Sequence, residues 1–138
     1  MASLIRIVCW LAPSLVLLGH GVHKVLDWPL TVDAASSTSS LLRHVWVVGP
    51  ETIARVAVGS EIFCGVLLLL ERSGRAALAT ATLLLVFTGV LFLLGTDGSW
   101  YAPYPCSGVG GYPIWLAIAR NAALIACCCL LLRWDKAR

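Results

Sequence analysis

Four apolar stretches take up most of the 138 residues of this chain, and they run over residues 4–25, 53–70, 76–94 and 113–132. Each is close to the ~20 residues that a helix needs to cross the hydrocarbon core of a bilayer. Charged residues make up only 12% of the sequence, whereas soluble domains carry about 25%. The sequence therefore predicts an all-α protein, a single membrane domain over residues 1–138 in which four transmembrane helices form one bundle.

Basic residues lie at the ends of these stretches and predict the topology by the positive-inside rule. Residues 71–75 contain two arginines, residues 133–138 contain three basic residues, and residues 96–112 contain neither lysine nor arginine. We therefore expect both termini and the middle connection to face the cytoplasm, in a multi-pass protein of the inner (plasma) membrane. Because the charges form no patch or stripe, nucleic acid is not an expected partner, and lipid is the main one.

The connection between the first two stretches has two parts. Residues 33–40 are small and polar and predict a loop. Residues 41–48 are expected to lie along the membrane interface as a short amphipathic segment. Gly49 and Pro50 then turn the chain into the second stretch.

Polar side chains inside the apolar stretches are costly unless they pair or line a cavity. His20 and Lys24 are four residues apart, hence on one face of the first helix. At ~1.5 Å per residue, Glu61 and Arg120 both lie on the order of 10–15 Å below the outer surface. This matched depth predicts a buried ion pair between Glu61 and Arg120. His20 and Asn121 are expected beside that pair, lining an outward-opening pocket.

A structural interpretation of the same residues is equally compatible with the sequence, since a buried ion pair can serve only to fix helix register. Arg55 and Lys24 are expected to extend toward the membrane interface. His20 and His23 are expected to bond polar neighbours rather than a metal, because no nearby cysteine or histidine pair completes a ligand set.

Six cysteines invite a redox hypothesis. Three of them, at residues 127–129, point about 100° apart on a helix, so they cannot form one dithiol site, and with Cys9 they are expected to pack the inner half of the bundle. Cys106 alone is placed in the outer, oxidising compartment. It lies shortly before a helix N-terminus, a position that favours thiol reactivity, which makes it the candidate catalytic thiol.

Three parts of the chain carry a resemblance to a known family. Residues 19–27 read GHGVHKVLD, residues 61–67 read EIFCGVL, and residues 105–111 read PCSGVGG, followed by ARNAAL at 119–124. They are similar, in order, to a glycine-then-lysine stretch, an E-x3-G-x-L pattern, and a Pro-Cys-Gly-Cys-Phe-Gly loop with an Arg-Asn/Asp-x-x-Leu helix after it. The chain thus resembles the MauE/DoxX family of small four-span, redox-associated membrane proteins.

The resemblance implies a role in forming or delivering disulfides, as in methylamine dehydrogenase maturation, beside a thioredoxin-like partner outside the cytoplasm. It implies Cys106 as the reactive thiol, above a polar pocket, and a quinone as the one cofactor that family analogy allows. The sequence departs from the family where its second loop cysteine falls on Gly108. Cys106 therefore has no close dithiol partner and would act by mixed disulfide with another protein.

Two further functions stay open at this point. One is a non-enzymatic role, as a small transporter or as an accessory subunit of a larger membrane complex, in which Glu61 and Arg120 matter and Cys106 is dispensable. The other is a family member that has kept the fold and lost the redox step. A bundle this small is also compatible with a homo- or hetero-oligomer that encloses the pocket.

Overall fold

The computed structural model describes residues 2–42, 49–71, 73–96 and 113–136, and these ranges are almost entirely helical. The helices are α1 (Ala2–Leu26), α2 (Trp28–Leu42), α3 (Pro50–Leu70), α4 (Gly74–Thr96) and α5 (Ile114–Lys136). All except α2 are long and apolar enough to span a membrane. The predicted all-α bundle with four spanning helices is therefore confirmed, with α5 extending past the predicted end of the fourth stretch. The orientation of the termini stays a prediction.

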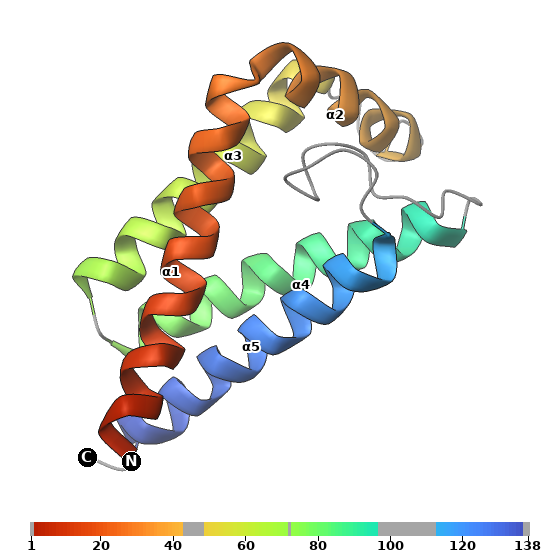
Figure 1. Ribbon diagram of the computed structural model, residues 1–138. Helices are drawn as coiled ribbons and strands as arrows, with labels where there is room; N and C mark the ends of the chain where they lie inside the picture. The colour runs from red at the N-terminus through yellow and green to blue at the C-terminus, as the bar shows by residue number, and fades with distance from the viewer. Residues whose placement is uncertain (1, 43–48, 72, 97–112, 137–138) are drawn as a thin grey trace.

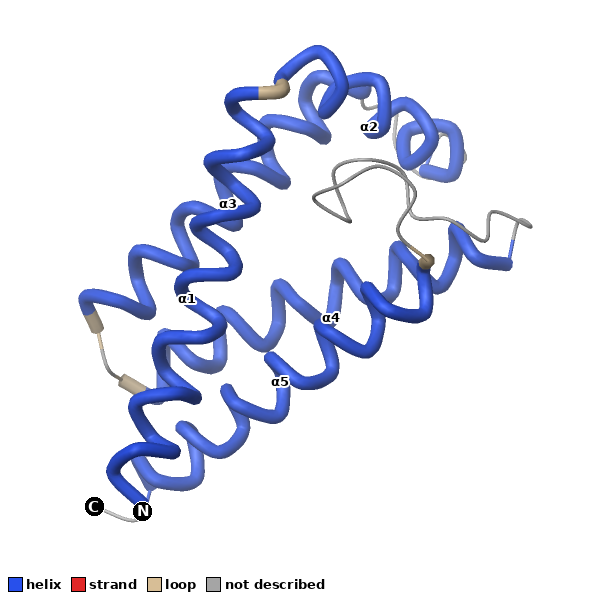
Figure 2. The backbone as a smooth tube through the Cα atoms, in the orientation of Figure 1, coloured by secondary structure: helices blue, strands red, loops and turns tan. Residues whose placement is uncertain are grey.

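The four long helices form two pairs, because α1 packs along α3 and α4 packs along α5. The pairs lie close together at the end that holds both termini, and they diverge toward the end that holds α2 (Figure 1, Figure 2). The core follows this shape. Near the termini one buried cluster unites Leu68 of α3, Ala77 of α4 and Cys128 of α5, whereas near the start of α5 the cluster of Leu91, Ile114 and Ala117 comes from α4 and α5 alone.

Two glycines set the close approach of α1 and α3. A Cβ atom at Gly21 would lie 2.5 Å from Ile62 Cγ1, and one at Gly65 would lie 2.8 Å from Leu18 Cγ. Small residues at such positions let two helix backbones approach closely, which is how membrane helices gain packing contacts. The crossing therefore brings the part of α1 that follows Gly21 against the first half of α3.

Residues 33–40 belong to α2, so the prediction of a loop there is wrong. The buried side chains of Thr31, Ala34 and Ala35 recur at the spacing of one helix face, and α2 packs mainly against α3. Within residues 33–40, this packing buries the small residues Ala34 and Ala35. The predicted interfacial segment lies outside the described residues from position 43 onward.

The start of α4 is held by the end of α5. Ser73 precedes α4, and its Oγ accepts a hydrogen bond from the Ala76 backbone amide at 3.4 Å. The carboxylate of Asp135, in the last turn of α5, accepts one from the Gly74 amide at 2.8 Å. A negative charge at a helix N-terminus also complements the helix dipole. Asp135 therefore joins the last turn of α5 to the first turn of α4.

Asp135→Ala is expected to lower the free energy of unfolding by about 1 kcal/mol, the typical effect of removing a helix cap. Denaturation of the purified protein by SDS in mixed micelles measures the change, and Asp135→Asn, which keeps an acceptor oxygen, is expected to lose less. Lys136→Ala is the matched control at a neighbouring exposed position. Equal losses for Asp135→Ala and Lys136→Ala would show that the carboxylate does not cap α4.

Candidate functional site: a buried polar cluster

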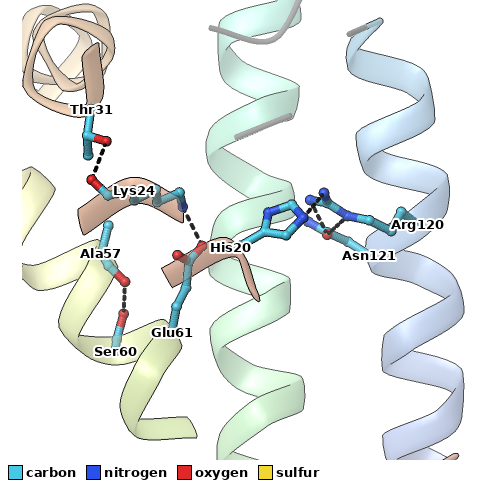
Figure 3. Close-up of polar contacts among 8 residues, drawn as sticks. All are labelled: His20, Lys24, Thr31, Ala57, Ser60, Glu61, Arg120 and Asn121. Carbon is cyan, nitrogen blue, oxygen red and sulfur yellow. Dashed lines mark hydrogen bonds and ion pairs between the residues drawn. The ribbon is translucent and has the colours of Figure 1, made fainter. Parts of the chain in front are cut away.

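A buried ion pair joins α1 to α3. Lys24 Nζ lies 2.5 Å from Glu61 Oε1, and the two side chains are only 7% and 5% exposed (Figure 3). The ammonium group also lies 5.6 Å from the centre of the Phe87 ring on α4, within cation–π range. Lys24 therefore does not extend to the interface as predicted. The close approach at Gly21 and Gly65 places it against an acidic partner inside the bundle.

Arg120 lies in a second polar group. Its Nη1 is 3.2 Å from His20 Nε2 on α1, and its Nε and Nη2 donate to Asn121 Oδ1 at 3.3 and 3.1 Å. The predicted ion pair of Glu61 with Arg120 thus had the wrong cation, since Lys24 takes that position. Position in the sequence gives how far along a helix a residue lies, but it does not say which way the side chain points around the helix axis.

Asn121 extends this second group to α4. It is only 2% exposed, and its Nδ2 donates to Thr88 Oγ1 at 3.2 Å. Thr88 in turn donates to the Leu84 backbone carbonyl at 2.7 Å. The chain of contacts therefore runs from His20 on α1 through α5 to Thr88 on α4. Thr88 was not among the predicted site residues, although a hydroxyl within an apolar stretch could have indicated it.

The two groups are neighbours, because His20 and Lys24 lie one helical turn apart on α1 (Figure 3). The structure thus brings His20, Glu61, Arg120 and Asn121, which were predicted to lie together, into one cluster with Lys24, which was expected at the interface. Whether they line an outward-opening pocket stays a prediction.

One carboxylate oxygen of this cluster is buried without a hydrogen-bond partner among the described residues, namely Glu61 Oε2. Leaving a buried acceptor unsatisfied costs ~1–3 kcal/mol. Chemically, this oxygen can accept a hydrogen bond or a proton, while Lys24 holds the other oxygen. Next to the ion pair, the Thr31 hydroxyl of α2 donates a hydrogen bond to the Lys24 backbone carbonyl at 2.9 Å and holds the end of α1 in place.

Cys106, the predicted catalytic thiol, lies outside the described residues. By sequence it belongs to the segment between Thr96, the end of α4, and Ile114, the start of α5. Cys64, by contrast, is buried in α3 in a core cluster with Leu17 of α1. Over the ranges that the structure describes, no group of three or more His, Cys, Asp or Glu side chains is placed to hold a metal ion.

Comparison with known proteins assigns the chain to a family. Searches of curated proteins and of solved structures gave no match. A family model described as methylamine utilisation protein MauE matches residues 1–134, nearly the whole chain. Four apolar helices of spanning length agree with that match. The chain is a multi-pass membrane protein and belongs to the MauE family.

Proposed function

We propose that this protein is the membrane component of an extracytoplasmic thiol–disulfide system, with Cys106 as its reactive thiol. The observation that carries the proposal is the buried polar cluster, which lies in the half of the bundle adjoining the α4–α5 connection. Arg120 is in the second turn of α5, and that connection contains Cys106. Membership of the MauE family supports the same function.

The chemistry of such a system is thiol–disulfide exchange. The Cys106 thiolate attacks a disulfide of a thioredoxin-like partner, forms a new S–S bond to one sulfur and releases the other as a thiolate. Because Gly108 stands where the family carries a second cysteine, a thiolate of the recipient protein must resolve this mixed disulfide: it attacks the Cys106 sulfur and releases the reduced partner. A second thiolate of the recipient then forms the recipient's own disulfide and releases the Cys106 thiolate. The family's description names methylamine utilisation, and the final recipient that we propose is a maturing periplasmic dehydrogenase of that process.

Family analogy adds a quinone to the proposal, as the acceptor of electrons from this system. A homo- or hetero-oligomer is proposed as the assembled form.

Thiol trapping in intact cells tests the proposal. A membrane-impermeant maleimide is applied with and without prior reduction. Labelling is expected to rise after reduction, and a higher-mass adduct is expected before it, both lost in Cys106→Ser. Cys129→Ser is the matched control, because Cys129 is exposed on α5 but lies within a spanning helix. Full labelling without reduction, and no adduct, would exclude a mixed disulfide at Cys106.

A second candidate function is that of an accessory subunit or small transporter built around the buried charges. The ion pair of Lys24 and Glu61 favours it, since this pair needs no cysteine to act. Two variants distinguish the two functions. If the protein is an accessory subunit or transporter, Glu61→Gln abolishes activity or assembly of the larger system, and Cys106→Ser leaves it unchanged. If the protein is a thiol–disulfide component, Cys106→Ser abolishes that activity.

A further inference from the structure

Basic side chains gather at the end of the bundle that holds both termini (Figure 1). Arg75 lies in the first turn of α4, and Arg133 and Lys136 lie in the last turn of α5. All three are exposed. The hydrogen bond from the Gly74 amide to the Asp135 carboxylate joins these two helix ends, so Arg75 and Lys136 each adjoin a residue of that contact.

A fourth basic residue comes from α1. Arg6 is partly buried, and it lies one turn before Trp10 on the same face of the helix. Trp10 in turn packs against the core cluster that contains Cys128 of α5, so this face of α1 is directed toward the end of α5. We call the four residues the terminal basic patch: Arg6, Arg75, Arg133 and Lys136.

None of these four cations pairs with a carboxylate of the described residues. The ion pairs in that part of the chain lie toward the α2 end of the molecule. The two described carboxylates near the patch have other partners, because Asp135 accepts a hydrogen bond from the Gly74 amide and Glu71 accepts one from the Ser73 hydroxyl at 3.3 Å. The patch is therefore suited to bind an anion from outside the chain.

The α2 end of the molecule has the opposite character. Outside the buried polar cluster, its described residues include three carboxylates, those of Asp27, Asp33 and Glu51, against a single arginine. That arginine, Arg55, is already paired with Glu51 at 2.6 Å. Within the described ranges, a basic surface without acidic partners thus lies only at the end with the termini.

We propose that the terminal basic patch binds the phosphate groups of anionic phospholipids and thereby ties the ends of α1, α4 and α5 together. The patch lies at the ends of three helices of spanning length, where the polar headgroup region of a bilayer begins. Three of its members are arginines, whose planar guanidinium groups bind phosphate through two parallel hydrogen bonds. Trp134, next to Arg133 in sequence, is a residue type enriched at this interface.

The patch does not involve Cys106 or the buried polar cluster. Lipid binding at the termini can therefore hold or fail independently of the proposed thiol–disulfide function.

Native mass spectrometry of the full chain, released from detergent micelles with added lipid, tests the proposal. Phosphatidylglycerol is compared with phosphatidylcholine, because only the first has a net negative charge. The unsubstituted protein is expected to bind phosphatidylglycerol more tightly. The double variant Arg75→Gln with Arg133→Gln is expected to weaken that binding roughly 25-fold, which is about fivefold for each cation removed, and to leave phosphatidylcholine binding unchanged.

Arg55→Gln is the matched control, because it removes an arginine that already has a carboxylate partner at the α2 end. It is expected to bind phosphatidylglycerol as the unsubstituted protein does. Equal affinity of the unsubstituted protein for the two lipids, or an equal weakening in the control, would overturn the proposal.

Thermal unfolding of the unsubstituted protein gives a second measurement that needs no variant to fold. Phosphatidylglycerol or inorganic phosphate, at the same concentration of phosphate groups, is added to the protein in mixed micelles of phosphatidylcholine and detergent. Phosphatidylglycerol is expected to raise the unfolding midpoint, since a ligand that binds the folded state stabilises it, and inorganic phosphate is expected to leave it unchanged. No rise with phosphatidylglycerol, or an equal rise with inorganic phosphate, would contradict a lipid site.

Discussion

Lys24→Ala is expected to lower the free energy of unfolding by about 3–5 kcal/mol, because it leaves the Glu61 carboxylate buried without its cation. Both side chains of this pair are less than a tenth exposed, so water cannot replace the lost partner. SDS titration of the purified protein in mixed micelles measures the loss. It is the largest effect that we expect from any single substitution in the bundle.

Arg55→Ala is the matched control for this prediction. Arg55 pairs with Glu51 at 2.6 Å, but these side chains are 69% and 57% exposed, and exposed pairs contribute ~0–1 kcal/mol. If Lys24→Ala cost no more than Arg55→Ala, the carboxylate of Glu61 would not depend on Lys24 for its burial.

The double variant Lys24→Met with Glu61→Leu separates stability from function. Apolar residues of similar volume often replace a buried ion pair at little cost, so we expect this variant to recover most of the stability that Lys24→Ala loses. If the activity of the larger system returned with the stability, the pair would act only as a packing element. If activity stayed lost in the stable double variant, the charges themselves would be needed.

Gly65→Ala is expected to lower the free energy of unfolding by about 1–3 kcal/mol, the range for overpacking a well-filled interface. The added Cβ would meet not only the Leu18 side chain but also its backbone nitrogen, at 3.2 Å. A change of rotamer cannot relieve a backbone contact, so α1 and α3 must move apart. The same SDS titration measures the loss.

Gly59→Ala is the control on the same helix. Nothing lies within 4 Å of a Cβ at Gly59, and alanine favours a helix over glycine by ~1 kcal/mol. We expect Gly59→Ala to leave the protein as stable as before or slightly more so. A loss as large as that of Gly65→Ala would mean that both glycines act through helix conformation rather than through the α1–α3 contact.

The residues of the polar site were predicted, but their partners were not. His20, Glu61 and Arg120 were recognised because charged and polar groups are rare inside spanning helices. Matching Glu61 with Arg120 was wrong, because position along a sequence gives the depth of a side chain and its face on one helix only. Which face of α3 meets α1 depends on how the helices pack, and that placed Lys24 at Glu61.

The same limit explains α2. Residues 33–40 looked like a loop because their small, polar side chains show no strong apolar face. Their helical spacing becomes meaningful only when α3 supplies the surface on which Thr31, Ala34 and Ala35 are buried.

The sequence by itself determined that this protein is a membrane protein with four spanning helices, since the length and apolarity of a segment are enough to decide whether it crosses a bilayer. It also determined which costly polar groups lie inside. Only the tertiary structure decided which of them meet. The reason is that the rotation of each helix about its axis is set by contacts such as Gly65 against Leu18, between residues far apart in the chain.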